Sequence, residues 1–167
     1  MLHIAGYLSF LLGSTNHHAV HSPFLFNYLT RCLYQGGWHY PSKAIGIALK
    51  SVPYFEIKSL GFLHEGQENE HILKQAFQGL RTDSPPFDLL ISECPDALLA
   101  RLSETNKPIF HNNTLCVIQN IHRNSRQKRG WDQINQQNPV RVTVDAFHCG
   151  LVFFRKELSR QDFKIRI

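Results

Sequence analysis

The hydrophobic positions of the chain follow a helical period in its first third and a mixture of strand and helix periods afterwards. Residues 2–12, 23–34 and 42–51 carry apolar side chains at mixed helical spacing. Ser22 precedes Pro23 and Ser42 opens the third run, and serine is a residue that often caps the start of a helix. The pattern predicts helices in these three ranges, so residues 1–50 form a helical extension packed on the remainder.

After residue 55 the pattern alternates between short apolar runs and longer amphipathic ones. The predicted strands are 56–63, 87–92 and 114–119. The predicted helices are 68–80, 95–103 and 125–137, the last anchored by Trp131 and Ile134. The stretches 35–42, 82–86 and 104–113 are predicted loops because they concentrate Gly, Pro and polar residues.

The carboxyl-terminal segment has the clearest pattern. Residues 140–146 alternate with a period of two, HCG at 148–150 predicts a turn, and 151–157 predicts a returning strand. Strand–helix units followed by a hairpin predict an α/β sheet that is parallel with an antiparallel edge. With 167 residues and no internal repeat, the chain is expected to form a single domain.

Composition narrows the functional classes. The net charge is +5, no Asp or Glu precedes Glu56, and a basic cluster comprises Arg123, Arg126, Lys128 and Arg129. Such a cluster can attract nucleic acid or another anion. No helix-turn-helix, RNP or zinc-finger signature accompanies it, so a solvated loop and helix start is the preferred interpretation and nucleic acid is not the expected partner.

The apolar runs and the cysteines indicate in which cellular compartment the protein is expected. No apolar run reaches the ~18–20 residues that span a bilayer. The opening MLHIAGYLSFLLG lacks the basic region and cleavage site of a signal peptide, so we interpret it as a buried or dimer-forming helix. The four cysteines, among them Cys149 in the predicted turn, form no CxxC motif, which predicts free thiols in the cytoplasm.

Four stretches carry a resemblance to a known family: HSPFLFNYLT, FDLLISECPD, LCVIQNIH and DAFHCGLVFFRKE, in this order. The chain resembles a bacterial family of class I S-adenosylmethionine (SAM)-dependent methyltransferases from about residue 21 to residue 167. The resemblance implies a reduced Rossmann-like sheet of about five strands. Their order would be 1-4-5-7-6 in the numbering of the parent fold, with an antiparallel last hairpin and helices on both faces.

The first departure from this family concerns its cofactor loop. In the family, the first strand ends in an acidic residue followed by a turn of the form E-x-G-x-x-x-G, whose glycines let the backbone approach SAM. The corresponding stretch here is IKSLGFLHEG. The resemblance places Ser59 at the acidic position and leaves Gly61 and Gly66 as the remnant of a cofactor-binding loop.

The second departure is a deletion. Members of the family continue into a strand whose end carries the carboxylate that holds the ribose of SAM, and a further strand follows. Here only about six residues separate Leu80 from the strand that begins at Phe87. They cannot hold two strands of ~5–6 residues each and a helix. The ribose-binding carboxylate therefore has no counterpart in the sequence.

The third departure concerns the catalytic edge. The family's D-G-x-H corresponds to Glu93, Cys94, Pro95 and Asp96, and its D-D-x-H corresponds to Gln119, Asn120, Ile121 and His122. The resemblance makes Glu93, Asn120 and His122 the remnant catalytic residues, with His122 a general base by its chemistry. The alternatives are a solvent-facing strand end for Glu93 and a loop histidine for His122. One carboxylate in place of two predicts no metal site.

We therefore expect a degenerate methyltransferase-fold protein without SAM or catalysis that acts as a binding or interaction module. Its expected partner is a second copy bound through the apolar N-terminal helices; a small-molecule ligand remains open. One alternative is an active SAM-dependent O-methyltransferase that acts on a small molecule through a rebuilt pocket. A further alternative is binding of an anion or nucleic acid through the basic cluster.

Overall fold

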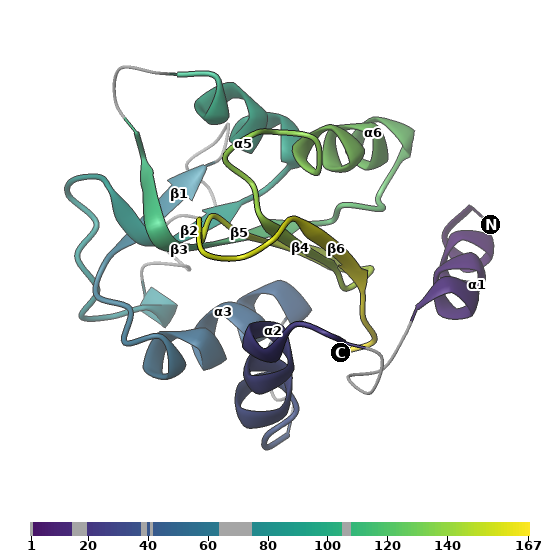
Figure 1. Ribbon diagram of the computed structural model, residues 1–167, viewed down its shortest axis with the longest axis horizontal. Coiled ribbons are helices and arrows are strands. Elements are labelled where there is room, and N and C mark those ends of the chain that lie inside the picture. The colour runs from purple at the N-terminus through teal and green to yellow at the C-terminus, as the bar shows by residue number, and fades with distance from the viewer. Residues whose placement is uncertain (1, 15–19, 38–39, 41, 64–74, 105–107) are drawn as a thin grey trace.

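A six-stranded mixed sheet forms the centre of the protein (Figure 1). The computed structural model describes residues 2–14, 20–37, 40, 42–63, 75–104 and 108–167. The strands are β1 (Leu60–Leu63), β2 (Phe87–Ser92), β3 (Phe110–Gln119), β4 (Val142–Asp145), β5 (Cys149–Phe153) and β6 (Gln161–Lys164). They lie side by side in the order β1-β2-β3-β5-β4-β6.

The five predicted strands are neighbours in the order that the resemblance implies. β1, β2 and β3 are parallel, and β5 runs antiparallel to both β3 and β4, so the predicted hairpin is confirmed. β6 was not predicted: it pairs in parallel with β4 and its side chains alternate between half-buried and exposed. An edge strand of four residues leaves only a short periodic signal, which explains why it was missed.

Helices cover both faces of the sheet, as predicted (Figure 1). α2 (Pro23–Tyr28), a π-helical turn η2 (Leu29–Leu33) and α3 (Lys43–Tyr54) lie on one face. α5 (Pro95–Leu102) and α6 (Ser125–Ile134) lie on the other. Two separate apolar clusters result, because successive residues of each strand point to opposite faces.

The predicted helix starts are confirmed at two positions. The Ser22 hydroxyl accepts a hydrogen bond from the Leu25 N–H, and the Ser42 hydroxyl accepts one from the Ile45 N–H. Each cap satisfies a backbone donor that the first helical turn leaves without a partner. Trp131 and Ile134 are buried and anchor α6 as predicted.

Several predicted boundaries are wrong. β1 begins only at Leu60, β3 extends back to Phe110 into a predicted loop, and Cys149 starts β5 and does not lie in the turn. The early start of β3 carries polar residues that no strand pattern marks, but Thr114 bonds the Phe87 carbonyl and the His111 N–H, which holds the backbone in place. Most of the predicted helix 68–80 lies outside the described residues.

Asp88 joins the first three strands at the edge where they begin. Its Oδ2 accepts hydrogen bonds from the backbone N–H groups of Lys58 and Ser59, each at 2.9 Å, and from the Ser59 hydroxyl at 3.0 Å. Its Oδ1 lies 2.9 Å from His111 Nε2. Burial alone raises the pKa of the Asp88 carboxyl, but these hydrogen bonds outweigh it and leave the pKa lowered.

Two glycines determine how closely α6 approaches its neighbours. A Cβ atom at Gly130 would lie 2.9 Å from Pro95 Cβ and 2.9 Å from Asp96 Oδ1, so α6 touches the start of α5 there. A Cβ atom at Gly150 would lie 2.3 Å from Cζ3 of Trp131. Glycine is required at both positions because close contact leaves no room for a side chain.

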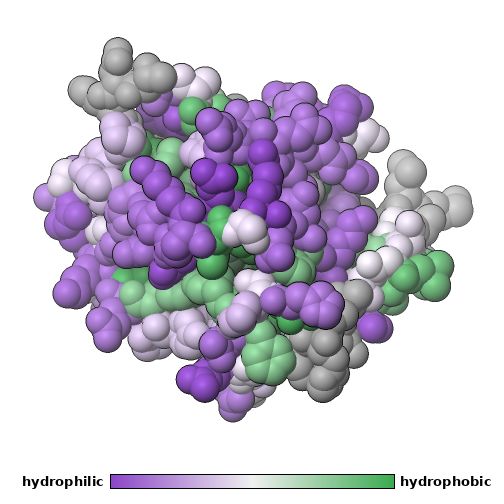
Figure 2. Space-filling model, viewed as in Figure 1, coloured by the Kyte–Doolittle hydropathy of each residue, from purple (hydrophilic) through white to green (hydrophobic). Residues whose placement is uncertain are grey.

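α1 (Leu2–Gly13) is helical as predicted and lies beside the sheet, at the right of Figure 1. Phe10 is buried, whereas Leu8 and Leu12 are 56% and 90% exposed. Apolar residues are visible on this helix in Figure 2. No helix in the described part of the chain has the length and apolar character needed to cross a bilayer.

Candidate functional site

The carboxyl ends of the parallel strands meet at one edge of the sheet, which we call the carboxyl edge. β2, β3 and β4 end there at Ser92, Gln119 and Asp145, and β5 begins there at Cys149. In open α/β sheets, ligands bind outside this edge because strand ends and helix starts converge there. The structure therefore brings the residues that follow each strand into one region.

His122 and Asp145 form the central contact of this edge. His122 Nε2 lies 2.7 Å from Asp145 Oδ2, and the two side chains are 17% and 6% exposed. The other Asp145 oxygen accepts a hydrogen bond from the Phe147 N–H at 2.9 Å. Because the carboxylate accepts, the imidazole proton belongs on Nε2, which leaves Nδ1 as the basic nitrogen.

Phe147 holds the histidine from one side. Its ring stacks on that of His122, with centroids 5.1 Å apart and planes 13° apart. Its backbone φ is 64°, a left-handed conformation that costs energy for a bulky residue and persists only where neighbours enforce it. Tyr7 and Phe10 of α1 contact the Phe147 ring, at centroid distances of 4.9 and 5.3 Å. They thus cover the stacked rings of Phe147 and His122.

Three small cavities lie along the carboxyl edge, and His122 lines two of them. The largest, about 240 Å³, is lined by Asn120, His122, Arg123, Phe147 and His148. A second, about 210 Å³, lies between Gln119, Asn120 and the start of α3, where Lys43 lines it. A third, about 160 Å³, adjoins His122 on the side of α1 and α6. Their polar and cationic lining suits small polar or anionic ligands.

Asn120 has a local structural role. Its φ is 55°, and asparagine tolerates this left-handed conformation better than most residues. Its N–H donates to the His148 carbonyl and its own carbonyl accepts from the Arg123 N–H, so it turns the chain between β3 and α6. The turn thus accounts for a short polar side chain, asparagine or aspartate, at this position.

The structure brings together two of the three predicted catalytic residues. Asn120 and His122 line the same cavity, whereas Glu93 follows β2 and does not line the three cavities around His122. The Glu93 N–H donates to the Leu63 carbonyl, which ties the end of β2 to that of β1. Within the described residues, no three His, Cys, Asp or Glu side chains are grouped as metal ligands.

Asp145 is the residue that sequence reasoning missed. It ends the alternating stretch VRVTVDA, and an acid at the carboxyl end of a strand is a signal that was present in the sequence. Its link to His122 was not apparent because the two residues are 23 positions apart. Only the insertion of β5 between β3 and β4 determines which strand ends come within reach of each other.

The predicted cofactor residues occupy other places. Ser59 was assigned to the end of the first strand, but it precedes β1, and its hydroxyl bonds Asp88 at the opposite edge of the sheet. Gly61 lies inside β1, where a Cβ atom would meet Phe87 at 2.5 Å and Leu90 at 2.8 Å. Strand packing accounts for this glycine without a cofactor. Gly66 lies outside the described residues.

The outer side of β1 has one contact with another segment among the described residues. A single parallel bridge joins Ser59 to Arg81, with hydrogen bonds from Leu60 N–H to Arg81 O and from Arg81 N–H to Lys58 O. The bridge lies at the start of β1. Along Gly61–Leu63, no described strand pairs with the outer side of β1. Among the described residues, the outer side of β1 is therefore an open sheet edge beyond this one bridge.

Comparison of the chain with known protein families, with curated proteins and with solved structures finds no match. The site must therefore be interpreted from its own geometry.

The basic cluster is partly neutralised by neighbouring acids. Arg126 forms an ion pair with Asp96 at 2.7 Å, and Lys128 forms one with Asp132 at 3.2 Å along α6. Arg123 lines the 240 Å³ and 160 Å³ cavities and Lys128 lines the latter, so these two members of the cluster add positive charge to the site.

The four cysteines are unpaired and differ in exposure. Burial raises the pKa of the Cys32 thiol to about 11 and that of the Cys149 thiol to about 12. Burial also raises the pKa of the Cys116 thiol. The three thiols with raised pKa values are poor nucleophiles because little thiolate forms at neutral pH. Cys94, at the start of α5, is only half-buried.

Proposed function

We propose that the chain is a non-catalytic binding or interaction module built on a reduced, Rossmann-like methyltransferase sheet. The observation that carries the proposal is the outer side of β1, along which no described strand pairs at Gly61–Leu63. Where the parent fold continues into the strand that grips the ribose of SAM, the described residues supply one bridge, Ser59 to Arg81, at the wrong end of the strand.

The size of the cavities supports the same proposal. Pockets for drug-sized ligands measure about 300–1,000 Å³. Each carboxyl-edge cavity is smaller, at about 160, 210 and 240 Å³. These spaces suit a small polar molecule beside His122 and Arg123 better than they suit a nucleoside cofactor.

Titration calorimetry with SAM and S-adenosylhomocysteine tests this proposal. We expect no binding stronger than a Kd of about 1 mM, or about −4 kcal/mol. A micromolar Kd, about −8 kcal/mol, would overturn the proposal.

A second candidate function is an active SAM-dependent O-methyltransferase, and one observation favours it. The His122–Asp145 contact orients an imidazole at the carboxyl edge, as a general base that takes a proton from a hydroxyl group requires. Release of S-adenosylhomocysteine in the presence of small hydroxylated acceptors measures this activity. Activity that His122→Gln abolishes, with folding intact, would favour this candidate over the first.

Binding of nucleic acid or another anion through the basic cluster is the weakest candidate, because two of its four cations already pair with acids. Its test is the anisotropy of a labelled duplex over a range of salt concentrations. Each phosphate contact adds to the salt dependence, so binding that does not change with salt excludes this function.

The proposal includes self-association through α1. Leu8 and Leu12 are exposed on this helix, and burial of such apolar surface favours association. Sedimentation of the native chain is expected to give a dimer, and the double variant Leu8→Glu with Leu12→Glu a monomer. A native chain that sediments as a monomer at all concentrations contradicts this part of the proposal.

A further inference from the structure

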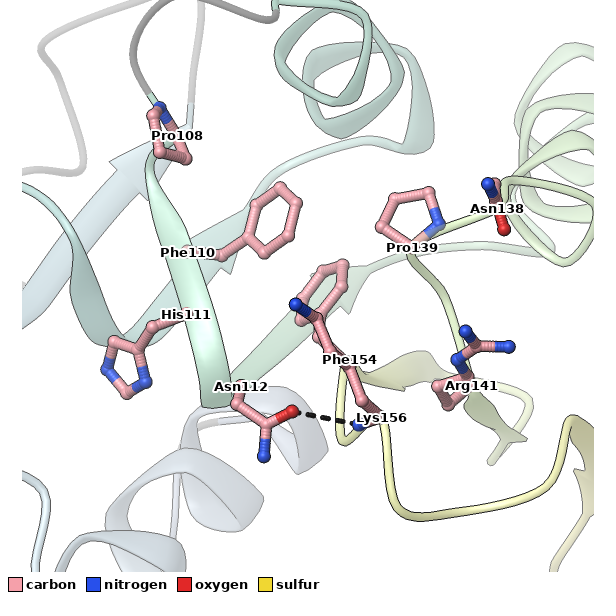
Figure 3. Close-up of a pocket in the computed structure, with 9 residues that line it drawn as sticks. All are labelled: Pro108, Phe110, His111, Asn112, Asn138, Pro139, Arg141, Phe154 and Lys156. Carbon is pink, nitrogen blue, oxygen red and sulfur yellow. Dashed lines mark hydrogen bonds between the residues drawn. The ribbon is translucent and has the colours of Figure 1, made fainter.

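A cavity larger than those of the carboxyl edge lies at the opposite edge of the sheet, and His122 does not line it. It measures about 420 Å³, within the range of small-molecule pockets. It is formed where β3 begins, where β5 ends and where the chain enters β4 (Figure 3). The lining residues are Pro108, Phe110, His111, Asn112, Asn138, Pro139, Arg141, Phe154 and Lys156.

Two aromatic rings form the apolar part of this cavity. Phe110 and Phe154 stack with centroids 4.2 Å apart and planes 18° apart. Figure 3 shows the pair in the middle of the lining, with Pro139 and Arg141 to one side and His111 to the other. Phe110 is half-buried, so part of its ring remains within reach of a ligand, while the buried Phe154 ring supports it from behind.

Two cations give the lining of this cavity a positive charge. Arg141 and Lys156 both line the cavity, and its described lining contains no Asp or Glu. The Nε atom of Arg141 is buried and has no hydrogen-bond partner among the described residues. A buried donor without a partner costs free energy, and an anion in contact with the guanidinium offsets that cost by restoring a favourable charge pair.

The cavity wall is fixed before any ligand arrives. The Arg141 N–H donates to the Phe153 carbonyl, and the Arg141 carbonyl accepts from the Gln161 N–H. Arg160 donates to the carbonyls of Asn135 and Gln137, which holds the loop that carries Pro139. A wall held in this way loses little conformational entropy when a ligand binds.

His111 and Asn112 are already engaged and act as supports. His111 Nε2 contacts Asp88, and its Nδ1 accepts from the Asn113 N–H, so the ring is neutral with its proton on Nε2. Asn112 accepts from the Lys156 N–H and donates to Glu157. The two groups in the lining that remain to meet an anion are the side chains of Arg141 and Lys156.

We propose that this cavity is a binding site for a small organic anion with a flat apolar body, such as an aromatic carboxylate. Phe110, backed by the buried Phe154, contacts the body, and Arg141 and Lys156 contact the carboxylate. The site is separate from the carboxyl edge, so it stands whether or not SAM binds.

Titration followed by ¹H–¹⁵N NMR tests the site with three probes: 2-naphthoate, its neutral counterpart 2-naphthalenemethanol, and inorganic phosphate. We expect 2-naphthoate to bind with a Kd below about 1 mM and to shift the amides of Phe110, Arg141, Phe154 and Lys156. The neutral alcohol and phosphate are each expected to bind at least tenfold more weakly, roughly the loss of one charged hydrogen bond.

The matched variants are Arg141→Gln and Lys156→Gln, each of which removes one cation from the lining. Each should weaken 2-naphthoate by roughly tenfold, while Arg129→Gln, an exposed cation of α6 outside the lining, should change the Kd less than twofold. Lys156 is exposed, so its variant keeps the test valid if Arg141→Gln fails to fold.

Three results would each overturn the proposal. The first is equal affinity for the neutral alcohol, which would remove the role of the cations. The second is equal affinity for phosphate, which would remove the role of the aromatic rings. The third is a set of shifts centred on Asn120 and His148, which would place the ligand at the carboxyl edge.

Discussion

Gly150 offers the sharpest test of how the sheet holds α6. The residue lies in β5, facing Trp131, and a Cβ atom there would approach three ring atoms of Trp131 at 2.3, 2.6 and 2.8 Å. Ordinary contact begins at 3.4 Å, so the ring and the strand must separate by about 1.1 Å, the difference between 3.4 and 2.3 Å. Trp131 is 2% exposed and has no open space to move into.

The magnitude follows from this geometry. Overpacking a filled core costs about 1–3 kcal/mol, and three simultaneous clashes with a rigid ring place Gly150→Ala at the upper end, about 3 kcal/mol. For a chain of this size, each kcal/mol lowers Tm by about 2–4 °C, so the expected fall is about 6–12 °C. Urea unfolding followed by far-UV circular dichroism measures the free energy of unfolding directly.

A double-mutant cycle identifies the contact as the cause. Trp131→Phe removes part of the indole and opens space beside Gly150, so Gly150→Ala in that background should cost less than about 1 kcal/mol. Gly13→Ala is the matched control, because a Cβ atom there meets nothing within 4 Å. The reasoning is refuted if Gly150→Ala costs under about 0.5 kcal/mol, or costs the same in the Trp131→Phe background.

Three further predictions concern the two edges of the sheet and the thiols. Because the folded-state pKa of Asp88 is lowered, its stabilising contribution is complete above the unfolded pKa of about 3.9 and is lost as pH falls through the lower folded value. Asp88→Asn should therefore cost about 1–3 kcal/mol at pH 7 and less below pH 3, and urea unfolding that shows a pH-independent cost contradicts this. Asp145→Asn should cost about 1.5–3 kcal/mol and change the His122 imidazole ¹⁵N shifts, since a neutral amide replaces the charged acceptor of Nε2; unchanged shifts would argue against the pair. Ellman's reagent at pH 8 should label Cys94 first and leave Cys32, Cys116 and Cys149 protected until urea unfolds the chain; rapid native labelling of two or more thiols would contradict the burial that raises their pKa values.

Much of the fold could be predicted because its signals are local. The alternation at 140–146, the apolar run at 87–92 and the caps at Ser22 and Ser42 each depend on a few neighbouring residues. Errors occurred where a distant partner decides the outcome. Thr114 fixes the polar start of β3 through the Phe87 carbonyl, and β6 exists because β4 offers it an edge.

The candidate site was predictable only in part. His122 and Asn120 were named from the resemblance to the methyltransferase family, and the structure places both at one cavity. The assignment of Ser59 to the end of the first strand was wrong, because β1 begins one residue later and its end falls at Leu63. An error of one strand length along the sequence moves a residue from the carboxyl edge of the sheet to the opposite edge.

By itself, the sequence determined the periodicities, the helix starts, the hairpin and the shortage of residues between Leu80 and Phe87. These are properties of short segments, and the physics of caps and alternation acts over a few residues. Only the tertiary structure decided that Asp145 meets His122, that Asp88 joins three strands, and that Arg141 faces a cavity floored by Phe110 and Phe154. Such contacts depend on strand order and register, which bring residues together across distances that no local pattern records.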